Sequence, residues 1–272
     1  MKEASSRQGR GSLEMSDYRP ADKKKPINLI SVNPTSIVRL LGALAFLLLL
    51  INIGFQLTVY ANGKPDLYGA RFFYFDSEDN LPAAYSTLLL LISALLLMVI
   101  TVLKKYQSGA MVFHWAVLSA GFLIMAIDEE LSIHEELIEP LRKILGYDGY
   151  GIFYYTWVIP AIVLIVVLGL FFLKFLIRLP VKTRIHFVVA GAVYIGGCIG
   201  VELIGGRYDE LHGKENLTYS LIATFEESLE MTGIIIFIWA LLVYIADTIK
   251  DVQFHVEGPK DQVSRAGGVF LY

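Results

Sequence analysis

Acidic side chains interrupt three otherwise apolar segments of this sequence, and one of these segments also supplies a histidine. The richest stretch is Ile127-Asp128-Glu129-Glu130-Leu131-Ser132-Ile133-His134-Glu135-Glu136, which directly follows an apolar run. Farther along, Glu202 and the group Glu226, Glu227 and Glu230 lie inside runs of apolar residues. A carboxylate in the hydrocarbon core of a membrane costs at least roughly 2.5–3.5 kcal/mol, so several of them need protons, a metal ion, water or polar partners. These residues define a candidate site.

No glycine or proline interrupts the acidic stretch before Pro140, so we expect the preceding helix to continue to that residue. At 100° per residue, Glu130 and His134 then lie one turn apart on an apolar face, with Asp128 on a neighbouring edge. Glu129 falls roughly opposite that face. Helical geometry alone therefore favours Glu130 and His134.

Carboxylates combined with an imidazole suit Fe, Mn or Zn, and helical bundles build such sites from Glu and Glu-x-x-His sequences. Here the Glu-to-His spacing is four rather than three, and one histidine is available at the depth of the acids. We expect a divalent metal site, either structural or catalytic; a catalytic metal would serve hydrolytic or redox chemistry on a lipid-soluble or periplasmic substrate, with a spare Glu as general base. The candidate ligands are Asp128, Glu129, His134, Glu135, Glu202, Glu226, Glu227 and Glu230.

Two other functions fit the same residues. In a proton- or cation-coupled transporter, the acids would alternate between protonated and ion-bound states. An accessory subunit of a larger membrane complex would instead present a broad apolar face and no enclosed cavity. Apart from these functions, a purely structural interpretation places the acids of the first stretch on an amphipathic helix at the membrane surface. That structural interpretation suits Glu129, Glu136 and Glu139 better than Glu202 and Glu230, which have apolar neighbours on both sides.

The elements that must position these residues are membrane-spanning helices. The chain is 55% hydrophobic and 18% charged, and its mean hydropathy is +0.57. Six apolar segments are long enough for the roughly 30 Å hydrocarbon core at about 1.5 Å per residue, and they cover residues 37–60, 83–103, 110–127, 152–177, 186–205 and 219–247. We therefore expect an all-α, polytopic membrane protein.

Local signals refine these segments. Asn80 predicts an N-cap, with Pro82 in the first turn of the second helix. Pro160 predicts a kink in the fourth helix. The fifth helix contains Gly191, Gly196, Gly197 and Gly200, which predict close approach to another helix. Residues 205–212 are expected to form a loop, from which His212 could approach the site.

Basic residues lie at alternate boundaries of the six segments: Lys23, Lys24, Lys25, Arg39, Lys104, Lys105, Arg178, Lys182, Arg184 and Lys250. With six crossings, all fall on one side, which the positive-inside rule makes cytoplasmic. We expect both termini in the cytoplasm, with a disordered tail at 1–36, the six-helix domain at 37–248 and a second tail at 249–272. The candidate acids then approach the opposite face of the membrane.

The composition also limits partners. The formal charge of -3 argues against nucleic acid, and a single cysteine, Cys198, excludes an intrachain disulfide framework. The first 36 residues are polar and mixed, so we expect no cleavable signal peptide in them. The expected partners are the lipid bilayer and either a second copy of this chain or a larger membrane complex.

Three segments resemble a group of uncharacterised bacterial multi-pass membrane proteins. They are residues 75–82 (FDSEDNLP), Asp128-Glu129 followed by Ser132-Ile133-His134-Glu135, and residues 226–233 (EESLEMTG). The likeness covers roughly residues 40–248. It implies an inner-membrane location and no particular reaction. It also implies a site containing Asp128, Glu129, His134 and Glu135, where helical geometry alone favours Glu130.

Overall fold

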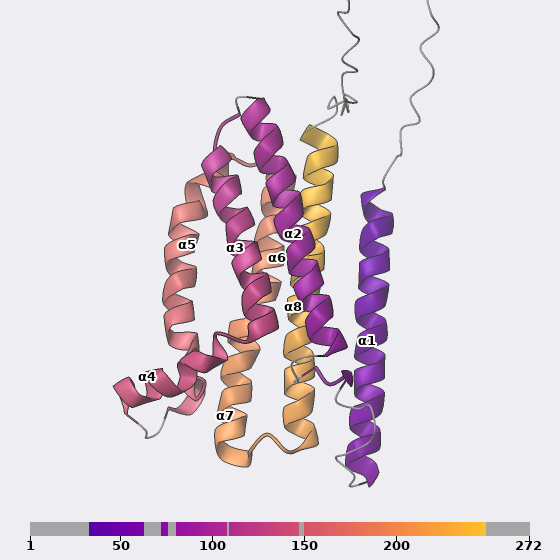
Figure 1. The fold of residues 1–272 in the computed structure, drawn as a ribbon, viewed down its shortest axis with the longest axis vertical. Coiled ribbons are helices and arrows are strands. Elements are labelled where there is room, and N and C mark those ends of the chain that lie inside the picture. The colour runs from indigo at the N-terminus through magenta and orange to yellow at the C-terminus, as the bar shows by residue number, and fades with distance from the viewer. Residues whose placement is uncertain (1–32, 63–71, 76–79, 108, 147–149, 249–272) are drawn as a thin grey trace, which may run out of the picture. The chain divides into compact units, whose positions relative to one another are not determined.

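The computed structural model describes residues 33–62, 72–75, 80–107, 109–146 and 150–248. These residues form an all-α fold (Figure 1), which confirms the predicted class. Its α-helices are α1 (Pro34–Asn62), α2 (Leu81–Tyr106), α3 (Val112–Leu131), α4 (Ile138–Leu145), α5 (Val158–Arg178), α6 (Val181–Ile195), α7 (Glu202–His212) and α8 (Leu217–Thr248). Residues 1–32 of the predicted N-terminal tail (1–36), the predicted tail at 249–272 and the acids Asp76, Glu78 and Asp79 lie outside the described residues. The end of the predicted N-terminal tail, from Pro34, is helical in α1.

Six helical segments in the described part of the chain are long and apolar enough to cross a membrane. Five are α1, α2, α3, α5 and α8. The other is a continuous 32-residue segment, Val181–His212, made of α6, a π-helical turn (Gly196–Val201) and α7. The six predicted crossings are therefore confirmed, with ends displaced by a few residues.

The helix of the third crossing extends beyond the predicted crossing (110–127) but ends before Pro140, to which we expected it to continue. α3 stops at Leu131 because Ser132 adopts a left-handed conformation (φ 47°), which no α-helix continues through. The chain turns there and forms a short 3₁₀ helix (Glu135–Leu137) before α4. Pro140 lies in the first turn of α4, where its missing N–H costs nothing. The predicted stacking of Glu130 on His134 along one helix is therefore wrong.

Two other local predictions need correction, and one is confirmed. Pro160 lies in the first turn of α5 rather than in a helix interior, so it does not break an internal hydrogen bond. Residues 205–212 are helical in α7 rather than a loop, because the helix continues through the π turn into α7 without a break. The Asn80 side chain accepts a hydrogen bond from the Ala83 N–H at 3.0 Å, so the predicted N-cap is confirmed.

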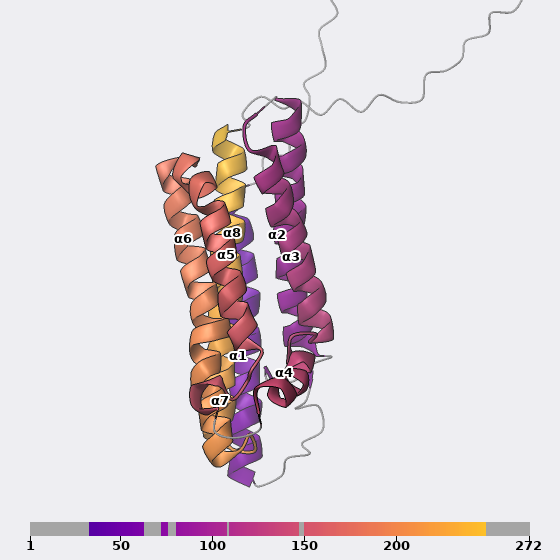
Figure 2. The same ribbon diagram turned by 90° about the vertical axis from the view of Figure 1, so that its left-hand side faces the viewer.

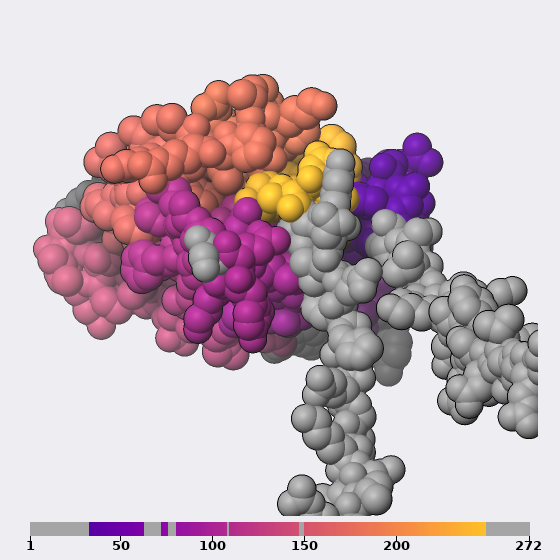
Figure 3. All heavy atoms as spheres, turned by 90° about the horizontal axis from the view of Figure 1, so that it is seen from above, coloured from indigo at the N-terminus to yellow at the C-terminus, as the bar shows by residue number. Residues whose placement is uncertain are grey.

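α8 is the helix against which the others are assembled. It packs against α1, α2 and the α6–α7 segment, and in the view from above it lies between α1 and α6 (Figure 3). α2 and α3 run side by side along their length (Figure 2). Near one end of these helices, the core contains Trp115, Phe175, Phe237 and Tyr244.

Small residues allow α6 and its π turn to approach α8 closely. A Cβ added at Gly197 would lie 2.9 Å from the Glu226 carbonyl oxygen, and one at Gly233 would lie 2.8 Å from the Tyr194 nitrogen. The predicted close approach is thus confirmed at Gly197, whereas an added Cβ at Gly191 or Gly196 would have nothing within 4 Å. Gly200, in the same π turn, has open space where its Cβ would be.

α1 is fixed to α8 by a buried polar group that sequence reasoning did not identify. Thr224 Oγ1 accepts hydrogen bonds from Asn52 Nδ2 at 2.9 Å and from Gln56 Nε2 at 2.8 Å. The same hydroxyl donates to the Ser220 carbonyl at 2.7 Å. Polar bonds of this kind join helices in lipid, where apolar contact gives little preference for protein over acyl chains.

The basic ends of the helices lie together. The N-terminus of α1 and the C-termini of α2, α5 and α8 all point to the upper end in Figure 1. The basic residues Arg39, Lys104, Lys105 and Arg178 belong to these ends. The C-terminus of α3 and the N-terminus of α8 point to the other end. Glu129 lies near that end of α3, and Glu226 lies in the N-terminal half of α8.

Candidate intramembrane acidic site

The turn after α3 is built around Asp128. Asp128 Oδ1 accepts a hydrogen bond from the His134 backbone N–H at 3.0 Å, and Oδ2 lies 2.9 Å from His134 Nδ1. The left-handed Ser132 lets the chain reverse so that both contacts form. Because the carboxylate holds Nδ1, the other ring nitrogen, Nε2, remains the one able to act on another group.

Trp157, at the start of α5, joins His134 to the helical segment that carries Glu202. The indole Nε1–H donates to Glu202 Oε1 at 3.0 Å. The ring centroids of Trp157 and His134 lie 4.5 Å apart. One side chain therefore spans the distance between the α3 turn and α7.

Four carboxyl groups from three spans come together beyond this contact. The side chains of Glu202 of α7 and Glu226 of α8 lie within hydrogen-bonding reach of each other. Glu230, one turn along α8, is close enough to Glu129, Glu202 and Glu226 for their charges to act on it. All four side chains are partly buried. We call Glu129, Glu202, Glu226 and Glu230 the acidic cluster.

Tyr194 of α6 completes this group. Its side chain lies beside Glu230, and the charges of Glu129 and Glu227 also act on it. The close approach at Gly233 brings the Tyr194 backbone against α8, which places the phenol beside the acids. Sequence reasoning missed both Tyr194 and Trp157, because their positions depend on contacts between helices.

The structure distinguishes two neighbouring acids that sequence patterns ranked differently. Glu129 points toward the other members of the acidic cluster, and the charges of Glu230 and His134 interact with it. Ser86 of α2 also lies beside Glu129, at a geometry looser than a hydrogen bond. Glu130 is exposed and accepts a hydrogen bond from Thr87 Oγ1 at 3.3 Å. The interpretation of Glu129 as a solvated surface acid is therefore wrong, and the residue set implied by the resemblance fits better here.

The other acids of the stretch are peripheral. Glu135 is exposed, although its charge acts on His134 and Glu202. Glu136 and Glu139 are also exposed, as the surface-helix interpretation predicted. Sequence reasoning thus placed these two correctly.

Three members of the acidic cluster lie on α3 and α8, and neither helix contains Lys or Arg. These two helices therefore supply no Lys or Arg charge to balance the acids. Arg207 of α7 is exposed and pairs with Glu210. His212 stacks on Tyr208, with ring centroids 4.5 Å apart, and it is exposed. Among these basic side chains, His134 is therefore the one that can place a positive charge beside the acidic cluster.

The protonation of His134 responds to two opposing influences. Burial lowers its pKa, whereas the hydrogen bond and charge of Asp128, with smaller contributions from Glu135 and Glu202, raise it; the net effect is a pKa above the ordinary value of 6.5. The imidazolium form is thereby favoured beside the acids. On the same membrane side, burial raises the pKa of Tyr155, whose hydroxyl donates to Asp209 at 2.7 Å.

The predicted metal ligands are only partly assembled. Within the described residues, no three His, Cys, Asp or Glu side chains are grouped so that they would hold one metal ion. Asp128 is bonded to His134 and Glu202 to Trp157, and Glu226 lies within reach of Glu202. A divalent ion would therefore require these side chains to move from the positions described.

The comparisons with known proteins identify a family and no activity. No curated protein matches this chain, and no solved structure matches it. A family model described as a domain of unknown function (DUF8692) matches residues 39–245, which include the acidic cluster, four whole spans and most of the first and last. The chain therefore belongs to the DUF8692 family.

Proposed function

We propose that this multi-pass membrane protein binds a cation inside the membrane, among the carboxyl groups of the acidic cluster. The observation that supports this most directly is the contact between Glu202 and Glu226. An ionised carboxylate has only hydrogen-bond acceptors, so two carboxyl groups bond to each other only when one carries a proton. The cation that this contact favours is a proton.

Charge balance supports the same proposal. Four carboxylates at close range in a poorly hydrated site resist simultaneous ionisation, because each destabilises the charge of the others. Imidazolium at His134 balances one negative charge. The remaining charge needs bound protons or another cation, so the state of the acidic cluster changes with what it has bound.

The arrangement suits proton-coupled transport. Trp157 contacts His134 and donates to Glu202, and Glu230 lies one turn farther along α8 than Glu226. A proton entering at His134 would pass to Glu202 and Glu226, then to Glu230 and Glu129. Proton carriers built from Asp, Glu and His chains inside membranes work by such steps.

Infrared spectroscopy of the purified protein tests the proton. At neutral pH, the parent should show the carbonyl band of a protonated carboxylic acid, and Glu226→Gln should reduce it. Glutamine has the shape of protonated glutamic acid and can donate to Glu202, so this variant should keep its fold. Glu136→Gln, which changes an exposed acid, is the matched control and should leave the band unchanged.

Proteoliposomes then test coupling. With an imposed pH gradient, vesicles containing the parent should acidify faster than those containing Glu230→Gln, reported by an enclosed pH-sensitive dye. Absence of the protonated-acid band, together with equal rates in the parent, Glu230→Gln and empty vesicles, would overturn the proton as the cation.

A divalent metal is the second candidate, and the contact between Asp128 and His134 favours it. A carboxylate that fixes Nδ1 while Nε2 faces a site is the usual support of a metal-binding histidine. His134, Glu202 and Glu129 would supply the ligands, and the metal would polarise or activate a bound group. Elemental analysis of the purified parent, beside a variant carrying His134→Ala and Glu230→Ala, distinguishes the two cations. Stoichiometric metal in the parent that is lost in the variant supports the metal. Absence of metal from both proteins supports the proton.

We further propose a bacterial inner-membrane location with both termini in the cytoplasm, because the basic helix ends lie together. The acidic cluster would then open to the periplasmic side. Alkaline phosphatase fused after Gly213 should be active if that loop is periplasmic, whereas a fusion after Lys105 should be inactive.

A further inference from the structure

α4 has three distinct faces. At about 100° per residue, Leu137, Ile144 and Leu145 fall within about 100° of one another, whereas Glu139 and Lys143 lie on the opposite side. Ile138 and Arg142 form the third face. The three apolar side chains are exposed, Ile144 at 79%. The helix is therefore amphipathic in addition to having one side turned to the protein.

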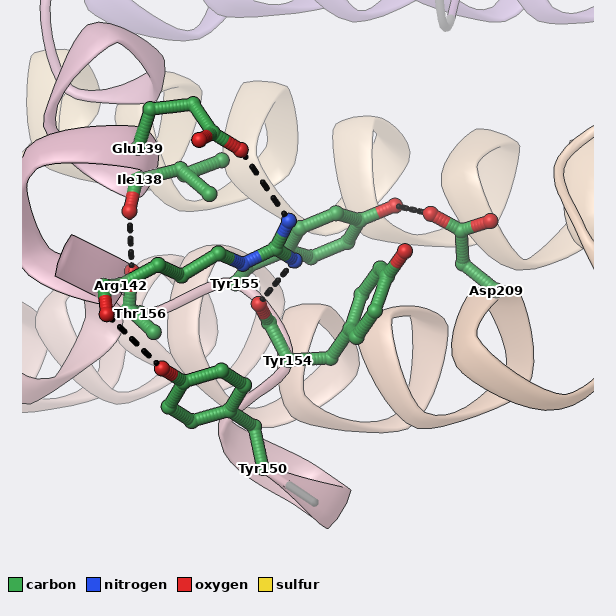
Figure 4. A network of polar contacts seen from close by, with 8 residues as sticks. All are labelled: Ile138, Glu139, Arg142, Tyr150, Tyr154, Tyr155, Thr156 and Asp209. Carbon is green, nitrogen blue, oxygen red and sulfur yellow. Dashed lines mark hydrogen bonds and ion pairs between the residues drawn. The ribbon is translucent and has the colours of Figure 1, made fainter. Parts of the chain in front are cut away.

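The third face of α4 is fixed by hydrogen bonds to the segment that leads into α5 (Figure 4). Arg142 donates to the Tyr154 carbonyl at 2.7 Å and contacts the Tyr154 ring at 4.4 Å. Tyr150 donates to the Arg142 carbonyl at 3.2 Å, and Thr156 donates to the Ile138 carbonyl at 3.0 Å. Because these bonds fix the rotation of the helix, Ile144 stays directed away from the protein.

The place of α4 in the chain puts it at a membrane boundary. It lies between the end of one span, α3, and the start of another, α5, and it runs across their direction (Figure 1). Tyr150, Tyr154 and Trp157 accompany it, and such aromatic residues prefer the level of the lipid headgroups. The exposed apolar side chains Leu131 and Ile133 connect the surface of α3 with that of α4.

We propose that α4 lies in the interfacial layer of the bilayer on the side of the acidic cluster, with Leu137, Ile144 and Leu145 inserted among the lipids. The occupant of this apolar face is the lipid surface, since the face continues the lipid-exposed surface of the spans. Glu139 and Lys143 face water. An amphipathic helix placed in this way reaches roughly 5–10 Å into the boundary between headgroups and acyl chains.

This position has a consequence for the turn that holds His134. Three residues separate His134 from Ile138, and they form the 3₁₀ helix Glu135–Leu137. An α4 anchored in lipid would restrain this turn from one side, while Asp128 restrains it from the other. The proposal does not depend on the identity of the bound cation.

Fluorescence quenching in reconstituted vesicles tests the insertion. One variant of the full-length chain carries Ile144→Cys, and the control carries Lys143→Cys on the adjacent polar face. Each new cysteine is labelled with a small fluorophore. The parent, whose single cysteine is Cys198, gives the background labelling. Lipids with a nitroxide quencher near the headgroup should quench the probe at residue 144 at least about twofold more than the probe at residue 143. Quencher lipids occupy both leaflets, so the orientation of the protein does not affect the result.

Two outcomes would overturn the proposal. Equal quenching at residues 143 and 144 would show that α4 does not lie in the interface with the rotation described. Weak quenching at residue 144, with a blue-shifted emission that indicates an apolar environment, would show that protein, such as a second copy of the chain, covers this face instead.

Discussion

Asp128 holds His134 through both carboxylate oxygens, one on the backbone N–H at 3.0 Å and the other on ring Nδ1 at 2.9 Å. The two residues are six apart in sequence, a separation at which an unbroken helix would turn them to different faces. The contact exists because α3 ends between them. It gives the histidine a fixed ring orientation beside the acidic cluster.

Asp128→Asn should lower the pKa of His134, because the amide keeps an acceptor for the backbone N–H but removes the charge that stabilises imidazolium. A pKa raised by folding gives stability that is fully present below the ordinary value of 6.5 and is lost as pH rises through the folded value. The melting temperature of the parent should therefore fall over that interval, and that of Asp128→Asn should change less. Thermal unfolding in detergent across pH measures this, with Glu139→Gln as a control; parallel curves for the parent and Asp128→Asn would contradict it.

Trp157→Phe should destabilise the protein by about 1–3 kcal/mol, because Glu202 loses a buried donor while the aromatic contact with His134 is largely kept. Unfolding in a denaturing detergent measures the change. Trp239→Phe is the matched control, since Trp239 packs on His186 instead. Equal stability of the two variants would show that the bond to Glu202 contributes little.

Gly197→Ala should cost about 1–3 kcal/mol, because its Cβ would lie 2.9 Å from a backbone oxygen of α8 and α6 would have to move outward. Gly200→Ala changes the same type of residue in the same π turn, where nothing lies within 4 Å. Its stability should therefore stay near that of the parent. A similar loss in both variants would mean that the π turn itself, rather than the contact with α8, requires glycine.

Thr224→Val should weaken the attachment of α1 to α8, because Asn52 and Gln56 lose their shared acceptor. Hydrogen bonds between membrane helices contribute roughly 0.6–2 kcal/mol. Thr58→Val is the control, since Thr58 is exposed and bonds only along its own helix, to the Gly54 carbonyl. Crosslinking between cysteines placed on α1 and α8 should decrease in Thr224→Val alone.

Much of the fold could be predicted because the membrane imposes simple requirements. A span must be apolar over about 20 residues, and the six segments between Pro34 and Thr248 carry that signal directly. The Asn80 cap was equally local, since a side-chain acceptor and a following proline are recognised without any tertiary contact. The position of Pro140 misled the prediction, since proline fits a first turn as well as a helix end.

The sequence predicted which acids belong to the candidate site better than it predicted how they are arranged. The types and depths of Glu202, Glu226 and Glu230 showed that these acids needed partners, because charge is expensive in lipid. The position of His134 relative to these acids was decided at Ser132, whose left-handed conformation ended the helix. The helical wheel applied to Glu130 and His134 assumed a helix that the chain does not form.

By itself, the sequence determined the all-α class, the six spans and the presence of acids within them, since each depends on residue types within a single segment. The tertiary structure decided that Glu129 rather than Glu130 faces Glu230, that Trp157 donates to Glu202, and that Tyr194 joins them. The physical reason is that helix rotation and separation depend on which small and polar residues meet between helices. Gly197 and Gly233 fix the approach of α6 to α8, and no pattern along one helix specifies its partner.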